Sequence, residues 1–325
     1  MGRLLLTLAY VCLTALPLAA GGVVWGYAEF TRPGPLEVSR VVVIPPGSGL
    51  DQIADTLASN SVVQRAEIFS IGAKLSGSAR ALMAGEYRFP ERVSPRDVME
   101  ILKSGRSVVR RLTLAEGLTV SQVLKKLATS DGLSGDIQVA PEEGSLLPET
   151  YHFFHGDQRG TLVARMQDGM TKLVAKFWQN RAGNLPYHTP AEAIVLASII
   201  ERETGSDAER SLISGVFTNR LRRGMRLQSD PTVAYGIAPA GLGRPLTRAD
   251  LRARTLHNTY IIKGLPPTPI CNPGAASIRA ALNPAKTDFL YFVANGTGGH
   301  AFGRTLYDHN RNVVRWRQLQ KNSQD

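Results

Sequence analysis

The sequence predicts an α+β protein that begins with an apolar, membrane-spanning helix. Residues 4–28 of the 325-residue chain carry no charged side chain, which sets this segment apart from the rest. After it, short strands are spaced irregularly among helices, without the sustained strand–helix alternation of a parallel sheet. The hydrophobic content of 43% is ordinary for a globular chain. The length favours two or three compact units.

The apolar N-terminal segment is long enough to cross a bilayer, for which about 20 residues suffice. Arg3 precedes it, and the aromatic residues Trp25, Tyr27 and Phe30 lie at its far end, where they suit the lipid–water interface. A cleaved signal peptide with small residues at 18–20 is the alternative. We expect residues 1–30 to form a short cytoplasmic tail and a retained single-pass anchor in the cell inner (plasma) membrane. The remainder would then be periplasmic or extracytoplasmic.

Four segments are expected after the anchor. Proline and glycine make residues 31–37 a stiff linker. Residues 38–104 form a small α/β subdomain, residues 105–150 a connecting strand–helix region, and residues 151–325 the largest domain. Hydrophobic periodicity in the subdomain predicts a strand at 41–44, helices at 50–58 and 66–74, a strand at 85–89 and a helix at 95–102.

A strand, a glycine turn and a short amphipathic helix recur at an offset of 70 residues. The first copy is centred on the turn at Gly47 and the second on the turn at Gly117. Both the turn glycine and the apolar helix positions match, which indicates an internal duplication. The alternative is a chance agreement between two common strand–helix starts.

The charge of the chain is concentrated in its C-terminal part. Lysine and arginine outnumber the acids 38 to 27, and residues 104–325 alone hold 28 basic and 18 acidic side chains. Such an excess favours an anionic partner. Nucleic acid is not expected as that partner, because an export-directing segment precedes the basic region and no recognition motif is present.

Metal and cofactor chemistry is not expected. The six histidines are scattered without a paired spacing, and the two cysteines, Cys12 and Cys271, form no cluster. Cys271 has no sequence-level partner that would make it a nucleophile, and a lone cysteine is more often packed in a core. The sequence also lacks a serine-hydrolase elbow and a phosphate loop.

The most promising acid lies at the end of a helix expected over 190–204. Thr189, Pro190 and Glu192 form a strong N-terminal capping sequence. Glu203 lies on the apolar stripe of this helix, near its C-terminus. Burial and the helix dipole both raise a carboxyl pKa there, which suits a general acid for glycosidic cleavage. The alternative is a core glutamate paired with an arginine such as Arg202, Arg220 or Arg226.

Three motifs together resemble the endolytic murein transglycosylase family, the YceG-like or MltG-type membrane proteins. They are Glu201-x-Glu203-Thr204, Leu227-Gln228-x-Asp230-Pro231-Thr232 and Gly264-Leu265-Pro266-Pro267. The resemblance extends over almost the whole chain and is dense from 147 to 310. It implies a LysM-like subdomain at 38–104, a mixed α+β catalytic domain at 151–325, and Glu203 as the catalytic residue. Glu149 stands where the family usually has aspartate.

The resemblance also implies a reaction and a substrate. Glu203 would protonate the bond between N-acetylmuramic acid and N-acetylglucosamine, then act as a base to form a 1,6-anhydromuramyl end. The partners would be peptidoglycan glycan strands, the cytoplasmic membrane and, as a further candidate, a peptidoglycan synthase; no cofactor or metal is implied. Asp230 is the second carboxylate if hydrolysis occurs instead. Further candidates for positioning the sugar are Gln228, Asn258, Tyr260, His300 and Asn310, each of which could equally be structural.

One alternative function does not need Glu203. The chain could be a non-catalytic, membrane-anchored scaffold that holds anionic peptidoglycan through its basic surface and its strand–helix modules. Loss of glycan cleavage with retained binding in Glu203→Gln would distinguish the enzyme from the scaffold.

Overall fold

The computed structural model describes the backbone of residues 2–322 and the side chains of residues 16–321. Among the residues searched, no helix is both long and apolar enough to cross a membrane. The predicted anchor includes residues 1–15, whose side chains lie outside the described part of the structure. The first helix, α1, extends over Gly2–Thr31 with Pro17 inside it.

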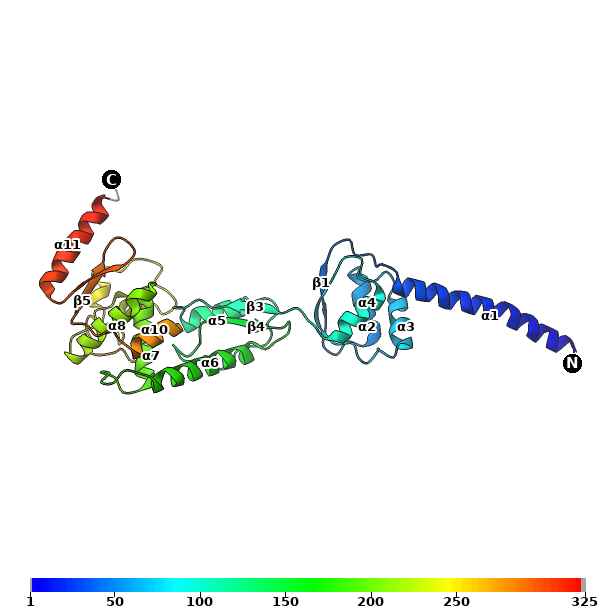
Figure 1. The fold of residues 1–325 in the computed structure, drawn as a ribbon, viewed down its shortest axis with the longest axis horizontal. Coiled ribbons are helices and arrows are strands. Elements are labelled where there is room, and N and C mark those ends of the chain that lie inside the picture. The colour runs from blue at the N-terminus through cyan, green and yellow to red at the C-terminus, as the bar shows by residue number, and fades with distance from the viewer. Residues whose placement is uncertain (1, 323–325) are drawn as a thin grey trace. The chain divides into compact units, whose positions relative to one another are not determined.

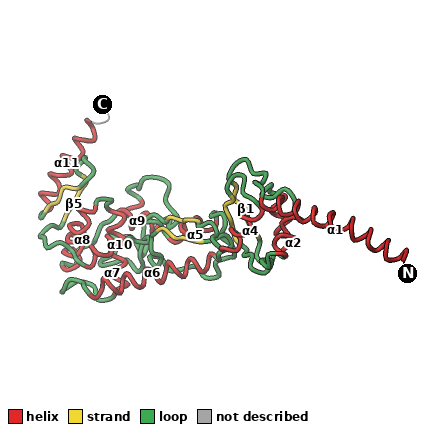
Figure 2. The backbone as a smooth tube through the Cα atoms, turned by 45° about the vertical axis from the view of Figure 1, so that its right-hand side comes forward, coloured by secondary structure: helices red, strands yellow, loops and turns green. Residues whose placement is uncertain are grey.

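The chain divides into two compact units, which are described separately. Unit 1 comprises Met1–Arg110 and His152–Gly156, and unit 2 comprises Arg111–Tyr151 and Asp157–Asp325. The predicted mixed α+β class is confirmed: within the described residues the strands form short two-stranded sheets among many helices, as Figure 2 shows. The predicted domain boundaries themselves stay a prediction.

Unit 1 contains a two-stranded antiparallel sheet packed on helices (Figure 1). Strand pairing extends in register from Arg40 opposite Phe89 to Ile44 opposite Gly85. Alternate strand residues such as Tyr87 and Phe89 are fully buried against the helices. The elements after α1 are β1 (Arg40–Ile44), α2 (Leu50–Ser59), α3 (Ala66–Leu75), β2 (Gly85–Phe89) and α4 (Pro95–Ser104).

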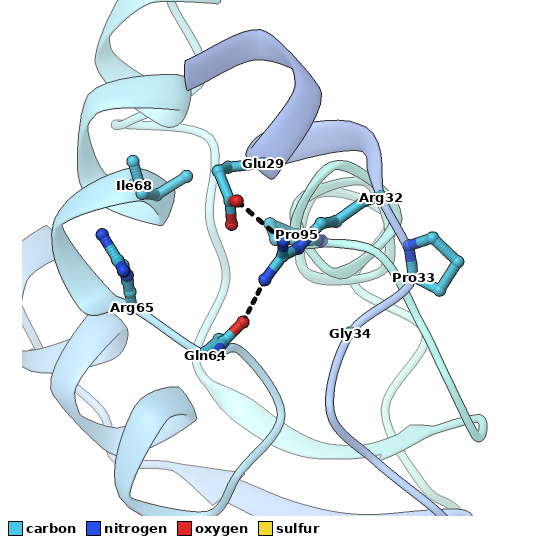
Figure 3. A pocket seen from close by; sticks show the side chains of 8 residues that line it. All are labelled: Glu29, Arg32, Pro33, Gly34, Gln64, Arg65, Ile68 and Pro95. Carbon is cyan, nitrogen blue, oxygen red and sulfur yellow. Dashed lines mark hydrogen bonds and ion pairs between the residues drawn. The ribbon is translucent and has the colours of Figure 1, made fainter. Parts of the chain in front are cut away.

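The segment after α1 lies against this unit. Arg32 forms an ion pair of 2.7 Å with Glu29 and also donates a hydrogen bond to Gln64 (Figure 3). The Gly34 amide donates to the Val93 carbonyl at 3.1 Å. A side chain at position 34 would collide with that carbonyl, since its Cβ would overlap the carbonyl oxygen. The expected linker 31–37 therefore begins as an ordered part of unit 1.

The repeated strand–turn–helix pattern has the same structure in both copies. Gly47 and Gly117 both adopt a positive φ, at 81° and 77°. In each following helix the glutamine three residues after the N-cap accepts a hydrogen bond of 3.0 Å from the N-cap amide. Shared cap chemistry, in addition to shared periodicity, favours duplication over chance.

Unit 2 is built on a layer of helices in which α7 and α10 pack against each other and against α6 and α8 (Figure 1). A hairpin and the C-terminal helix lie at one side. Two strands, β3 (Arg110–Thr113) and β4 (Thr150–Phe153), include residues of both units. The other elements of unit 2 are α5 (Val120–Ala128), α6 (Arg159–Gln179), α7 (Pro190–Glu203), α8 (Asp207–Arg222), α9 (Asp230–Ile237), η1 (Asp250–Arg252), α10 (Ala275–Leu282), β5 (Tyr291–Ala294), β6 (His300–Gly303) and α11 (Leu306–Asn322).

The core of unit 2 encloses most of α7. Leu196, Ile199 and Ile200 have no exposed surface, and Phe217 from α8 is 1% exposed. Phe217 meets Phe292 of the hairpin edge to face at 5.7 Å. The buried middle of α7 fixes the position of its last residue, Glu203.

A buried ion pair is expected to contribute strongly to unit 1. Arg110 donates two hydrogen bonds of 2.7 Å to Glu86, whose side chain is 5% exposed. Arg110→Ala would remove both of these hydrogen bonds and the positive charge beside a buried carboxylate, so we expect a loss of roughly 2–3 kcal/mol in unfolding free energy. Urea unfolding measures it. The neighbouring exposed Arg111→Ala should cost less than about 0.5 kcal/mol, and equal effects of the two changes would contradict the account.

Candidate active site

Helix α7 carries Glu203 at its last position. The predicted capping sequence is confirmed: Thr189 accepts a hydrogen bond from the Glu192 amide at 3.2 Å, and Glu192 accepts one from the Thr189 amide at 2.9 Å. At the other end Thr204 leaves the helical conformation, and its amide bonds the Ile200 carbonyl at 3.3 Å. Glu203 therefore projects from a helix that is fixed at both ends.

The side chain of Glu203 is partly buried, next to the polar side chain of Ser229. The pKa of Glu203 is raised to about 7; burial is the largest cause, and the neighbouring charge of Asp230 acts in the same direction. Ser229 donates a hydrogen bond of 2.5 Å to Oε1, and this bond opposes the rise, as do the more distant charges of His300 and Arg220. The result is a carboxyl group that titrates near neutral pH.

The predicted alternative of an arginine-paired core glutamate is not what the structure contains. Within the described part of the chain, Glu203 forms no ion pair. Arg220 is 6% exposed and uses its guanidinium on the carbonyls of Leu290 and Leu227, each at 2.6 Å. Its guanidinium also lies 5.2 Å from the ring of Tyr291. Arg220 thus braces the hairpin and the loop before α9. It affects Glu203 only electrostatically, because its positive charge lowers the pKa of that carboxyl group.

The segment that carries Ser229 is held by a network of hydroxyl groups. The Ser229 amide donates to Thr259 Oγ1 at 2.9 Å, and the Gln228 amide donates to the Thr259 carbonyl at 3.2 Å. Thr232 and Thr259 share a further hydroxyl bond of 2.8 Å. Gln228 adopts a positive φ of 53°, which is uncommon for a residue with a Cβ. The strained turn at Gln228 directs the neighbouring serine at the carboxyl group.

Asp230 and Tyr260 form a second polar pair beside Glu203. The Tyr260 hydroxyl donates to Asp230 Oδ1 at 2.6 Å, and burial raises the pKa of Tyr260 far above its usual range. Asn258 is fully buried and places this tyrosine: its amide group donates to the carbonyls of Leu251 and Ala253, and its oxygen accepts from the Tyr260 amide at 2.9 Å. Asn258 therefore shapes the site through its own loop.

His300 approaches the site from the hairpin. Its ring Nδ1 lies 2.7 Å from Glu209 Oε2, and its backbone amide donates to the other oxygen of that carboxylate at 2.8 Å. Phe292 packs edge to face against the imidazole at 5.3 Å. These contacts fix the imidazole ring, and the electrostatic interaction of His300 with Glu203 lowers the pKa of Glu203.

The structure thus brings some of the predicted residues together and not others. Asp230, Tyr260 and His300 all lie close enough to Glu203 to interact with it electrostatically. Gln228 contributes mainly through its backbone, since within the described residues its exposed side chain accepts a single long bond, 3.5 Å, from Arg220. Asn310 is exposed on α11, and no hydrogen bond joins it to the site within the described residues. Sequence reasoning missed Ser229, although it lies inside the motif around Asp230.

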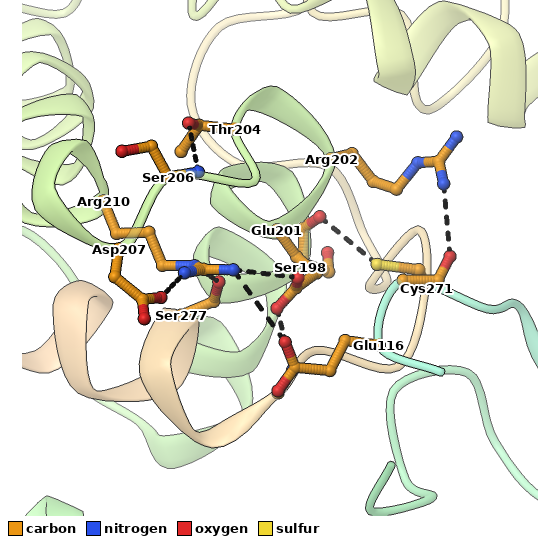
Figure 4. Close-up of polar contacts among 12 residues, drawn as sticks. Glu116, Ser198, Glu201, Arg202, Thr204, Ser206, Asp207, Arg210, Cys271 and Ser277 are labelled. Carbon is orange, nitrogen blue, oxygen red and sulfur yellow. Dashed lines mark hydrogen bonds and ion pairs between the residues drawn. The ribbon is translucent and has the colours of Figure 1, made fainter. Parts of the chain in front are cut away.

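The other acid of the motif, Glu201, has a different role. Its carboxylate accepts the Gly274 amide at 2.9 Å and lies 3.6 Å from Arg210. Arg210 also reaches Glu116 at 3.8 Å, together with Asp207 and Ser277 (Figure 4). This cluster, in which Arg210 and Glu201 are buried, connects the end of α7 to α8 and α10. The charge of Glu201 is therefore balanced by Arg210, whereas Glu203 has no ion pair among the described residues.

The donor set offers no evident metal site. Among the described residues, no group of three or more histidine, cysteine, aspartate or glutamate side chains could hold a metal ion. Cys271 is buried, bonds the Ser198 carbonyl at 3.4 Å, and has its thiol pKa raised by burial. A neutral, enclosed thiol of this kind is a packing residue.

Two substitutions are expected to move the pKa of Glu203 in opposite directions. Ser229→Ala removes a hydrogen bond to the charged form, so the pKa should rise above about 7. Asp230→Asn removes a like charge, so the pKa should fall. Carbon NMR titration of labelled glutamate, with Glu203→Gln to assign the signal, measures both. Shifts of the same sign would contradict this geometry.

Stability gives an independent readout of the same group. The folded-state pKa of about 7 exceeds the ordinary 4.5, so the contribution of Glu203 is complete below pH 4.5 and is lost as pH rises through 7. The native chain should lose stability relative to Glu203→Gln over this window.

Comparisons with known proteins agree with the motifs. The model of the YceG-like family matches residues 42–315. A relative from Bacillus subtilis named endolytic murein transglycosylase is 30% identical, and the alignment covers 82% of each chain. A relative from Streptococcus pneumoniae with the same name is also 30% identical, over 84% of this chain but 57% of the relative.

A solved structure agrees as well. The crystal structure of a yceG-like protein from Listeria monocytogenes is 30% identical, with a TM-score of 0.53 over 84% of this chain and 98% of that one. The family match spans most of the chain and includes the whole region from Glu203 to His300. The chain therefore belongs to the YceG-like family.

Proposed function

We propose that this protein is an endolytic peptidoglycan lytic transglycosylase with Glu203 as its single catalytic carboxyl group. The observation that carries the proposal is the chemistry of Glu203: a carboxyl group without an ion-pair partner among the described residues, with a pKa of about 7. Such a group can give up a proton and take one back near neutral pH. The names of the relatives in Bacillus subtilis and Streptococcus pneumoniae supply the substrate class, murein.

The first chemical step is acid catalysis. Protonated Glu203 donates its proton to the oxygen that bridges C1 of N-acetylmuramic acid and the next N-acetylglucosamine. The C1–O bond breaks, the electron pair leaves with the oxygen, and positive charge develops on the muramyl ring. We assign the stabilisation of that charge to the carboxylate of Asp230, which the Tyr260 hydroxyl orients.

The second step uses the same residue as a base. Glu203, now a carboxylate, removes the proton from the C6 hydroxyl of the muramyl ring, and O6 forms the new bond to C1. The product is a 1,6-anhydromuramyl end, water is not consumed, and Glu203 is again protonated. One group suffices for both steps because its pKa lies close to the working pH.

Ser229 determines which oxygen of Glu203 reacts. Its hydroxyl group occupies Oε1, while no donor among the described side chains bonds Oε2. Oε2 is therefore the atom for proton transfer. His300, fixed by Glu209, and Tyr260, bonded to Asp230, are our first candidates for contact with the sugars. Gln228 and Asn310 stay weaker candidates, and Asn258 acts through the loop that it braces.

The remaining proposals concern location and biological role. The charge-free residues 4–28 support a single-pass anchor in the inner membrane, with the catalytic unit outside the cytoplasm. The β1–α2–α3–β2 order of unit 1 supports a LysM-like module. An enzyme held at the membrane would cut nascent strands and so set glycan length, with a peptidoglycan synthase as candidate partner. The alternative function is the non-catalytic wall-binding scaffold.

Replacement of Glu203 tests the reaction directly. Glu203→Gln should lower strand cleavage by about 10³-fold or more, since it removes both acid and base. Mass spectrometry of purified glycan strands should find anhydromuramyl ends with the native protein alone. Glu201→Gln is the matched control on the same helix, and it should retain the anhydro product although it weakens the Arg210 cluster. Reducing ends would indicate a hydrolase that uses Asp230. The absence of products from both the native protein and Glu203→Gln would favour the scaffold.

Removal of the N-terminal segment tests the location. In cell fractionation, the full chain should stay in the membrane fraction after high-salt and alkaline washes, because about 20 apolar residues hold it there. A chain that starts at residue 31, fused to a cleaved export signal, should be released as soluble protein. Release of the full chain by salt alone would contradict an integral anchor.

A further inference from the structure

We propose that a basic groove beside the active site, lined by Arg248, Arg252 and Arg254, binds the carboxylate groups of the stem peptides on the glycan strand. This inference rests on the proposed function and deepens it, because it assigns a recognition site for the peptide side branches. Those branches are attached to the same muramyl sugars whose bonds Glu203 would break.

The groove is connected to the active site through Tyr260. Its walls are the three arginines together with Leu251, Tyr260 and Ile261. The hydroxyl group of Tyr260 bonds Asp230 at 2.6 Å, next in sequence to the serine that contacts Glu203. A ligand that fills the groove therefore contacts Tyr260, the side chain that bonds Asp230 beside Glu203.

The three arginines are exposed and uncompensated. Asp250 is the acid nearest to them in sequence, and Arg244 already engages both of its oxygens, at 2.6 and 3.0 Å. Among the described residues, Arg248, Arg252 and Arg254 have no ion pair with a carboxylate. The groove thus concentrates positive charge that the protein itself does not neutralise, and it explains part of the basic excess in residues 104–325.

The backbone under the arginines is fixed before any ligand arrives. Asn258 bonds the carbonyls of Leu251 and Ala253 at 3.1 and 2.7 Å, so it holds the residues between the arginines. Asp250 accepts the Thr247 amide at 2.7 Å and closes the turn before η1. A preorganised set of cations loses less entropy on binding than a flexible one.

The chemistry of the groove matches a peptide with acidic groups. A guanidinium group binds a carboxylate through two parallel hydrogen bonds. Leu251 and Ile261 add apolar surface between the charges, which suits small aliphatic side chains such as alanine. Stem peptides combine both features, since they alternate small apolar residues with free carboxylates.

A different anion, the pyrophosphate of a lipid-linked strand, fits the location less well. A strand carries only one such group, at its end, so it would approach the groove only when cleavage occurs near that end. Stem peptides occur on every muramyl sugar, so one lies near Glu203 wherever an internal cut is made.

The test compares strands with and without peptides. The triple variant Arg248→Gln, Arg252→Gln, Arg254→Gln should lower kcat/KM about 10- to 100-fold on peptide-bearing strands. It should leave kcat/KM unchanged on strands whose peptides have been removed by an amidase. The control variant Arg223→Gln, Arg315→Gln, Arg317→Gln removes the same charge from exposed positions elsewhere and should behave as native on both substrates. Equal losses on both substrates, or no loss on either, would overturn the proposal.

A binding experiment keeps the proposal testable if no cleavage is found. Fluorescence anisotropy would measure the binding of a labelled muramyl peptide to the protein in the Glu203→Gln background. The protein with the three arginines should bind this peptide at least tenfold more tightly than the triple glutamine variant does. A peptide with its carboxylates amidated should bind both proteins equally. Equal affinity with and without the arginines would overturn the groove assignment. Displacement by inorganic pyrophosphate but not by the free peptide would overturn the choice of ligand. Absence of cleavage with arginine-dependent binding would instead reject only the proposed reaction.

Discussion

The burial of one carboxyl group, that of Glu203, is the constraint on which the site depends. Residues 196–200 of α7 have no exposed surface, so packing fixes the rotation of the helix and with it the position of its last residue. Burial without an ion-pair partner raises the pKa of Glu203 to about 7. An arginine within ion-pair distance would remove this effect, and the structure instead directs Arg220 to backbone carbonyls.

The surroundings of Glu203 consist of loops that brace one another. Thr259 holds the Gln228–Ser229 turn, Asn258 holds the loop that presents Tyr260, and Glu209 holds His300. Thr259 and Asn258 are fully buried and each has defined hydrogen-bond partners, as interiors require. The charge cluster around Arg210 fixes the end of α7 from the other side (Figure 4). Proton transfer needs such fixed geometry, because small displacements of an acid from its substrate cost rate.

Local patterns predicted the local features well. Capping residues and periodicity located α7, and the spacing of Glu203 from Ile199 and Ile200 placed it on the apolar face that the structure confirms. The turn at Gly117 and its helix followed from the repeat. Contacts between distant segments could not be read in this way. The Ser229–Glu203 bond and the two carbonyls that engage Arg220 depend on how loops meet, which no spacing within one segment encodes. For the same reason Asn310 was grouped with the site although it lies exposed on α11.

The most direct test of the account is cleavage in water labelled with heavy oxygen. If Glu203 alone transfers protons and the C6 hydroxyl attacks C1, water contributes no atom, so mass spectrometry should find every new muramyl end anhydro and unlabelled. Labelled reducing ends in the initial products would contradict the account. They would mean that water attacks C1, and that a second carboxyl group such as Asp230 takes part in the chemistry.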